Sequence, residues 1–183
     1  LYILPCAGDS GISIGSGLWG IYNLLGFERE NPEETSIKMA SYGKKYNNKE
    51  IEETLEKFKA EGNKIKWQLK TDEEIYKSAA QKIIEGNIIG WFRGGSEIGP
   101  RALGNRSMLA DARSKEMKDT INRRIKHREA FRPFAPSILV DHLPEYFDTE
   151  IPEPFMLRVV KCKEKAIKEI PAIVHLDNTA RVQ

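Results

Sequence analysis

The sequence predicts a mixed α/β fold, because short apolar runs typical of strands are interspersed with amphipathic helical segments. Helical periodicity covers four stretches, and compact apolar runs such as residues 88–92 lie between them. With 183 residues, 40% of them apolar, the chain can form one core, which excludes a disordered tail or a fibre. No apolar run approaches the roughly 20 residues of a membrane span, so we expect a soluble protein that does not enter a membrane.

The first half of the chain is predicted to contain three helices. Residues 1–4 are typical of a strand, residues 8–11 of a tight turn, and residues 13–25 of a helix that Gly26 ends. Residues 28–48 are polar and lack periodicity, which indicates a connector. A second helix begins near Lys49 and stops at Gly62-Asn63. Thr71 and Glu74 have capping-box spacing, so a third helix should run to about Glu85 and bury Ile75, Ala79 and Ile83.

The second half should add strands and one longer helix. Ser114 is a candidate cap for a helix over residues 114–125 that buries Met117, Ile121 and Ile125. Leu143 to Phe147 resembles a helical turn. The remaining apolar runs predict strands at residues 88–92, 107–110, 137–140, 155–160 and 172–175.

The charge of the chain is unevenly distributed. The net charge is only +2, but residues 93–132 carry eleven lysines and arginines against five acids. The rest of the chain has 18 basic and 22 acidic residues, so the pattern predicts a localised anion-binding region. Cys6 and Cys162 cannot make a disulfide framework, which favours a reduced, cytoplasmic setting with two passive thiols.

The densest functional signal is a glycine-rich loop at residues 93–106. Its four glycines allow close backbone approach to a ligand, and Arg101 and Arg106 supply planar charged groups suited to phosphate. The Walker spacing is absent. An equally good interpretation from composition is that the glycines only make turns and that Arg101 pairs with Glu97.

Two further clusters carry polar residues. If residues 126–132 are extended, Lys126, Arg128 and Arg132 share one face, which favours a polyphosphate or acyl phosphate between them, while Phe131 and Phe134 pack into the core. The third cluster is His175-Leu176-Asp177-Asn178-Thr179-Ala180-Arg181, at a predicted strand end. His175 taken alone is more typical of a structural histidine, and the three scattered histidines give no zinc spacing.

These clusters carry a family resemblance. Gly99-Pro100-Arg101-Ala102-Leu103-Gly104-Asn105-Arg106-Ser107, then Lys126 through Arg132-Pro133-Phe134-Ala135-Pro136, then residues 175–183 resemble the carbamoyltransferase C-terminal region of the NodU/CmcH/TobZ family. Residues 5–17 are similar to the last part of the preceding Kae1-like, actin-ATPase-type domain. The resemblance implies a piece of a longer protein: residues 1–27 end the Kae1-like domain, residues 28–48 connect, and residues 49–183 form a truncated YrdC-like domain, a twisted mixed sheet with flanking helices.

The resemblance also implies an ATP-dependent O-carbamoyltransferase of the cytoplasm. Carbamoyl phosphate and ATP with Mg²⁺ would give carbamoyl adenylate in the YrdC-like domain, and the Kae1-like domain would transfer the carbamoyl group to a hydroxyl of a sugar or natural product. Implied nucleotide and carbamoyl-adenylate contacts are Arg101, Lys126, Arg132 and Arg181, with Lys126 and Arg132 catalytic and Arg106 and Ser107 of second rank. Asp9 is implied as one ligand of a divalent metal such as iron, whose other ligands would come from the remainder of the Kae1-like domain.

Two positions depart from the family pattern, and two other functions stay open. Gly95 stands where the family often has a basic residue, and Asn178 where it usually has glycine, although asparagine tolerates left-handed geometry. One alternative is threonylcarbamoyl-adenylate formation for tRNA modification. The other is a non-catalytic RNA-binding module, which we disfavour because Trp91, Phe92, Phe131 and Phe134 stand in apolar contexts that look buried.

Overall fold

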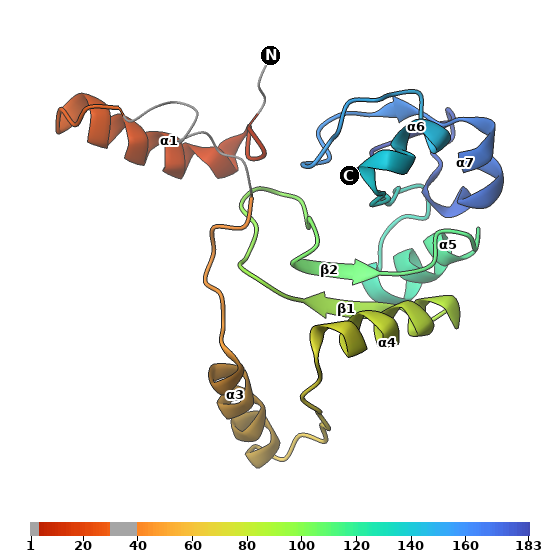
Figure 1. The fold of residues 1–183 in the computed structure, drawn as a ribbon, viewed down its shortest axis with the longest axis horizontal. Coiled ribbons are helices and arrows are strands. Elements are labelled where there is room, and N and C mark those ends of the chain that lie inside the picture. Colours follow the sequence, from red (N-terminus) through yellow and green to blue (C-terminus); the bar gives the residue numbers. More distant parts are fainter. Residues whose placement is uncertain (1–3, 30–39) are drawn as a thin grey trace.

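The computed structural model describes residues 4–29 and 40–183, and over this range it confirms a mixed α/β protein (Figure 1). The predicted strand at residues 1–4 lies outside the described residues except for Leu4. Helices and strands are interspersed along the chain, and each of the two described sheets is a single antiparallel pair. The elements are α1 (Ile12–Trp19), α3 (Asn48–Ala60), α4 (Asp72–Ile84), β1 (Ile89–Phe92), β2 (Arg106–Leu109), α5 (Met117–Ile121), α6 (Leu143–Tyr146), β3 (Val160–Lys161), α7 (Glu164–Glu169) and β4 (Thr179–Ala180).

The first helix agrees with its prediction and stands away from the other elements (Figure 1). Helix α1 continues directly into a π-helical turn, η2 (Gly20–Leu24), and Gly26 follows with a φ of +69°. None of the side chains of α1 is buried. The segment therefore presents a row of exposed apolar residues, which are Ile12, Leu18, Trp19, Ile21, Leu24, Leu25 and Phe27.

Helices α3 and α4 begin with complete capping boxes. The Thr71 hydroxyl accepts from the Glu74 N–H, and the Glu74 carboxylate accepts from the Thr71 N–H at 2.8 Å, as the sequence predicts. Asn47 and Glu50 make the same exchange at the start of α3. In α4 the predicted inner face is correct in direction, because Ile75, Ala79 and Ile83 are half-buried while their neighbours are exposed.

Strands β1 and β2 form an antiparallel pair that holds the glycine-rich loop between them (Figure 1). In their register Trp91 faces Ser107 and Phe92 faces Arg106. The predicted burial of β1 is wrong for one face, because its residues alternate and Phe92 is 63% exposed. The Arg106 guanidinium covers the Phe92 ring at 3.5 Å from its centroid, so a cation and not the core packs on that face.

The predicted helix over residues 114–125 changes its pitch after Ile121. Met117 and Ile121 are buried as expected, but α5 continues as a π-helical turn, η3 (Asn122–Lys126). The wider π turn rotates the residues that follow its start, so Ile125 is exposed, contrary to the prediction. Asn122, the first residue of the turn, is fully buried. Ser114 does not cap the backbone of this helix; its hydroxyl donates to the Glu116 carboxylate.

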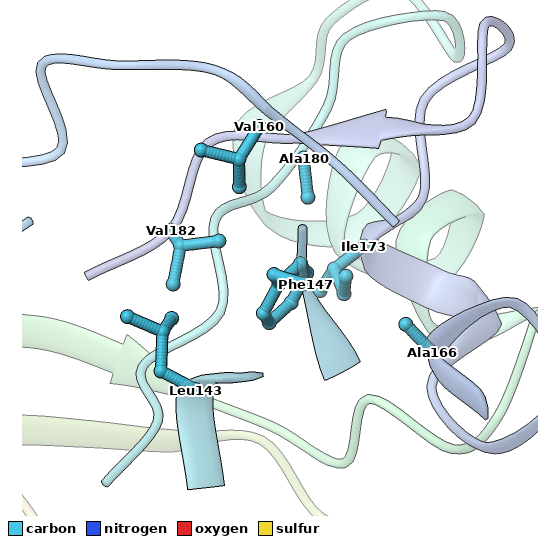
Figure 2. Close-up of a cluster of buried hydrophobic side chains, with 7 residues drawn as sticks. All are labelled: Leu143, Phe147, Val160, Ala166, Ile173, Ala180 and Val182. Atoms are coloured by element: carbon cyan, nitrogen blue, oxygen red, sulfur yellow. The ribbon is translucent and has the colours of Figure 1, made fainter. Parts of the chain in front are cut away.

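The main core lies in the last 45 residues, where α6, β3, α7 and β4 meet around Phe147 (Figure 2). Ala180 and Val182 point into this cluster, and both are fully buried. A second cluster joins α5 to the turn η5 (Pro171–Ile173) through Met117, Ile121 and Ala172. The two clusters fix the chain's last segment against α5, and that contact builds the site described below.

Three predicted strands are wrong in extent. Residues 155–160 contribute only Val160 to β3, because Met156 takes a left-handed φ of +53° that interrupts an extended run. Residues 171–173 form a 3-10 turn, and the strand of this region is β4. Residues 137–140 form no assigned strand, although Gln183 donates to the Pro136 carbonyl and accepts from the Ile138 N–H.

Candidate anion-binding site

Glu97 organises the glycine-rich loop from within. Its Oε1 accepts from the N–H groups of Asn105 at 2.7 Å and Leu103 at 2.9 Å, with Arg106 at 3.4 Å. Burial raises the pKa of Glu97, but these backbone donors outweigh it, and the net pKa is lowered. The carboxylate is therefore engaged by the backbone, and the ion pair with Arg101 that composition allowed is not among the described ion pairs.

Arg106 and Ser107, the two second-rank candidates, make hydrogen bonds inside the loop. Arg106 Nη1 donates to the carbonyls of Arg93 at 2.7 Å and Asn105 at 2.8 Å, and Nη2 donates to Gly94 at 3.2 Å. The Ser107 hydroxyl accepts from the Gly104 N–H at 3.0 Å. Contact of either residue with a nucleotide stays a prediction, and in this structure both hold the loop in shape.

Gly95 packs tightly against the segment at residues 40–43. The Gly43 N–H donates to the Ser96 carbonyl at 2.9 Å, and the Ile98 N–H donates to the Ala40 carbonyl at 2.7 Å. A Cβ placed on Gly95 would lie 2.4 Å from the Gly43 oxygen. The departure from the family pattern at Gly95 is thus explained by this contact, which leaves no room for a side chain.

Gly95→Ala should lower the free energy of unfolding by about 1–3 kcal/mol, because the new methyl group forces two backbone segments apart. Chemical denaturation measures this directly. Gly90→Ala is the matched control, since a Cβ at Gly90 meets no atom within 4 Å and should cost nothing. Equal stability of the two variants would show that the 40–43 segment does not pack on the loop.

The end of the chain brings Arg181 toward Arg101. Because Ala180 and Val182 point into the core, the alternation of an extended segment turns the Arg181 side chain to the opposite side. Gln183 Nε2 donates to the Leu103 carbonyl at 2.9 Å, which ties this segment to the loop that carries Arg101. Arg101 and Arg181, which are 80 residues apart in the sequence, are thus brought near each other in the fold.

Arg101 and Arg181 are half-buried, and neither pairs with an acid in the part of the chain that the structure describes. In both side chains the Nε atom is buried without a hydrogen-bond acceptor among the described residues. Burial lowers the pKa of Arg181, and the positive charge of Arg101 lowers it further. Two neighbouring cations without a counter-charge are unfavourable in the empty protein, and an anion between them would remove the repulsion.

His175 lies in the same cluster. Burial lowers its pKa, the Asp177 carboxylate opposes this, and the charges of Arg181 and Lys118 reinforce it. Lys118 reaches the cluster because α5 packs on η5, two residues before His175. Asn178 completes the turn with a φ of +59°, which confirms that asparagine serves in the left-handed position.

Lys126, Arg128 and Arg132 do not form the extended face that the spacing suggested. Lys126 ends η3, His127 follows in a left-handed conformation with φ of +47°, and the chain turns at Ala130-Phe131. The predicted burial of Phe131 is also wrong, since it is 73% exposed, whereas Phe134 packs on the second cluster.

A buried amide holds this turn together. Asn122 Nδ2 donates to the carbonyls of Arg132 at 3.0 Å and Ala130 at 3.4 Å, and its Oδ1 accepts from Arg128 Nε at 2.7 Å. Arg128 stacks over the Phe134 ring at 4.8 Å, and its Nε donates to Asn122 and not to Glu97 or Glu129, the two acids whose pairing with a structural Arg128 the sequence also allows. Lys126 and Arg132 are exposed, and Arg132 has only a distant pairing with Glu129 at 4.0 Å.

The described residues do not fit a metal centre. Asp9 is exposed at the start of η1 (Asp9–Gly11), and no group of three or more metal-ligating side chains is found within residues 4–29 and 40–183. A role for Asp9 stays a prediction that depends on ligands from elsewhere. Both cysteines are free thiols; burial, and then the charge of Asp177, raise the pKa of Cys162, so it stays protonated at neutral pH.

The sequence motifs pointed to Arg101 and Arg181 and placed His175 in the third cluster without giving it a role. Two residues that shape the surroundings, Lys118 and Asn122, were not singled out. Lys118 was one of eleven basic residues at 93–132, and no pattern indicated that Asn122 is buried. The arrangement as a whole can bind an anion through Arg101 and Arg181, with Lys118 nearby.

Comparison with known proteins adds an independent view of the chain. Residues 80–183 match the family model described as Carbamoyltransferase C-terminus. Nodulation protein NolO of Bradyrhizobium diazoefficiens is 39% identical over 188 residues, which cover 100% of this chain and 32% of that protein. Nodulation protein U of Sinorhizobium fredii is 52% identical over 93 residues, covering 51% of this chain and 16% of that protein.

The similarity extends beyond the nodulation proteins. An uncharacterized protein of Synechocystis sp. is 34% identical over 203 residues, covering 100% of this chain and 32% of that protein. The chain therefore spans about a third of the length of the curated relatives that it matches from end to end. No helix within the described residues is both long and apolar enough to cross a membrane.

Proposed function

Since this chain belongs to the carbamoyltransferase C-terminal family, we propose that its arginine pair binds the phosphate groups of carbamoyl phosphate and ATP during formation of carbamoyl adenylate. The observation that carries the proposal is the pair itself: Arg101 and Arg181 are half-buried, the charge of Arg101 acts on Arg181, and neither Nε atom has an acceptor among residues 4–29 and 40–183. Such groups are stable together mainly when an anion neutralises them.

The reaction balances with one water molecule. Water first breaks the bond between the carbamoyl and phosphate groups of carbamoyl phosphate, which releases phosphate and carbamate. A carbamate oxygen then forms the bond to the α-phosphorus of ATP as the bond to pyrophosphate breaks, which gives carbamoyl adenylate and pyrophosphate. Negative charge builds on the phosphoryl oxygens in this step, and fixed guanidinium donors stabilise it without reorganising. Arg101 and Arg181 supply such donors, because the loop and β4 fix their backbones.

The proposed roles of Lys126 and Arg132 rest on the family motif and on the exposure of their side chains. Both side chains are exposed to solvent, and Asn122 holds the backbone of Arg132 by a hydrogen bond to its carbonyl. They would contact the polyphosphate end of ATP, where Mg²⁺ would bind the phosphates and screen their charge. No step of the proposal goes through a metal at Asp9, because the described residues supply no further ligand.

We further propose that the exposed apolar row of α1 and η2 packs against other parts of a longer carbamoyltransferase. Seven large apolar side chains gathered in one exposed segment are unusual on a free surface. The relatives are about three times as long as this chain, so they contain material that could cover it. Transfer to a hydroxyl of a sugar or natural product would belong to that whole protein.

Exchange of labelled pyrophosphate into ATP tests the adenylation step. The protein that carries this chain should catalyse exchange only when carbamoyl phosphate and Mg²⁺ are both present. Arg132→Ala and Lys126→Ala should each lower the exchange rate at least roughly a hundredfold, because a lost charged contact to the transition state costs about 3 kcal/mol. Lys77→Ala is the control, since Lys77 makes an exposed ion pair within α4.

Three outcomes separate the possible functions. Absence of exchange above background would refute the proposal, and unchanged rates in both variants would refute the roles of Lys126 and Arg132. Exchange that requires threonine and bicarbonate would indicate the tRNA-modification reaction. Steeply salt-dependent binding of arbitrary RNA without exchange would favour the RNA-binding module, whose main objection is weaker now that Phe131 is seen to be exposed.

A further inference from the structure

The hydrogen bonds around His175 fix which of its nitrogens carries a proton. The Thr179 hydroxyl donates to Asp177 Oδ1 at 2.7 Å, and a carboxylate can only accept. The Thr179 oxygen, 3.0 Å from His175 Nδ1, must therefore accept a hydrogen from that nitrogen. In the neutral ring the other nitrogen, Nε2, then carries a lone pair and acts as an acceptor.

This acceptor is buried and has no donor among the described residues. The charged groups that bear on the ring are Asp177, Arg181 and Lys118. Asp177 accepts hydrogen bonds from the N–H and the hydroxyl of Thr179, while the side chains of Arg181 and Lys118 carry only donors. His175 Nε2 is thus the acceptor in a cluster that otherwise offers donors to an anion.

A carbamoyl phosphate molecule has the complementary pattern. Its phosphate and carbonyl oxygens accept hydrogen bonds, and its amide group is its only donor at neutral pH. Resting on the function proposed above, we infer that His175 Nε2 accepts a hydrogen bond from the carbamoyl amide and makes the site selective for carbamoyl over other acyl phosphates. Acetyl phosphate has a methyl group in place of the amide and would leave the buried nitrogen unsatisfied.

The protonation state of the ring supports this role. Burial lowers the pKa of His175, and Arg181 and Lys118 lower it further against the opposing effect of Asp177. The imidazole is therefore neutral at neutral pH and keeps its acceptor. As the pH falls through the lowered pKa, Nε2 gains a proton, becomes a donor and should lose its selectivity for the amide.

Competitive binding of carbamoyl phosphate and acetyl phosphate to this chain tests the inference. The unmodified protein should prefer carbamoyl phosphate about tenfold or more, because carbamoyl phosphate satisfies the buried His175 Nε2 acceptor and acetyl phosphate leaves it without a donor. His175→Phe keeps a ring without an acceptor and should bind the two acyl phosphates within about twofold of each other. His175→Gln, whose amide oxygen can take the place of Nε2, should restore part of the preference.

Two additional measurements exclude a merely structural role. The ¹⁵N resonance of His175 Nε2 should move on addition of carbamoyl phosphate but not of acetyl phosphate. His142→Phe is the matched control, because His142 pairs with Glu145 in a different part of the fold and should keep the preference. The preference of the unmodified protein should also disappear as the imidazole becomes protonated.

The outcomes distinguish this inference from the proposed function. If the unmodified protein does not bind carbamoyl phosphate, both are overturned. If it prefers carbamoyl phosphate and His175→Phe retains the same preference, the inference alone is overturned, and the arginine pair is sufficient for binding.

Discussion

Arg181→Met should make the ligand-free protein more stable while it removes most of the affinity for phosphate anions. The guanidinium of Arg181 is half-buried, is repelled by Arg101, and has no acceptor for its Nε among the described residues, so its loss relieves an unfavourable interaction. A methionine of similar length keeps the packing of the stem. We expect a gain of about 1 kcal/mol in the free energy of unfolding.

Binding of inorganic phosphate should fall roughly thirtyfold or more in the same variant, which corresponds to the loss of about 2 kcal/mol from one charge-assisted contact. Calorimetric titration measures the affinity, and thermal unfolding with and without phosphate measures the stability. Phosphate should raise the melting temperature of the unmodified protein and have little effect on Arg181→Met.

Arg113→Met provides the matched control, because Arg113 is exposed and already paired with Asp111 at 2.6 Å. That variant should keep its phosphate affinity and should not gain stability. If Arg181→Met is less stable than the unmodified protein and binds phosphate equally well, Arg181 has a partner in solution, and the anion site is wrongly assigned.

Asn122→Ala should lower the free energy of unfolding by about 2–4 kcal/mol, the largest loss we expect from a polar residue of this chain. The side chain is fully buried, and its amide serves Arg128 and the carbonyls of Ala130 and Arg132. Truncation removes the buried amide and leaves these groups without the partner that joins them. Chemical denaturation measures the loss.

The effect of Asn122→Ala should extend to the segment between Lys126 and Arg132, which includes the turn at Ala130-Phe131. Hydrogen exchange at residues 127–133 should accelerate, while exchange in β1 and β2 stays near its original rate. Asn87→Ala is the control, since the Asn87 side chain is exposed and donates to the Lys82 carbonyl, which the Asn87 backbone N–H continues to contact in the variant. A loss of stability no greater than in Asn87→Ala would show that Asn122 does not organise this turn.

Features that depend on neighbours in the sequence were predicted well. The capping box of Thr71 and Glu74, the end of the first helix before Gly26 and the left-handed Asn178 each involve contacts within a few residues. The strand predictions at residues 155–160 and 172–175 were wrong, because the backbone conformation of these segments does not depend on sequence neighbours alone. Apolar runs show that a segment packs on a core, but they do not show in which backbone conformation it packs.

The candidate site shows the same contrast between features that the sequence predicts and features that depend on the folded structure. The motifs identified Arg101 and Arg181 as residues of interest and indicated the family, which the comparisons confirm. Composition left open whether Arg101 pairs with Glu97. In the structure the N–H groups of Leu103 and Asn105 donate to the Glu97 carboxylate. Residue spacing does not predict which backbone donors of a folded loop reach a given acceptor.

The sequence alone therefore determined the helix starts and turns, the mixed α/β class, the concentration of positive charge and the family. Only the tertiary structure decided which of those charges have partners among the described residues. Arg106 and Arg128 are held by carbonyls and by Asn122, whereas Arg101 and Arg181 are brought together by Gln183, which follows β4 and is hydrogen-bonded to the Leu103 carbonyl of the loop. The physical reason is range: a cap is satisfied within one helical turn, but the counter-charge of a side chain depends on every segment that folds beside it.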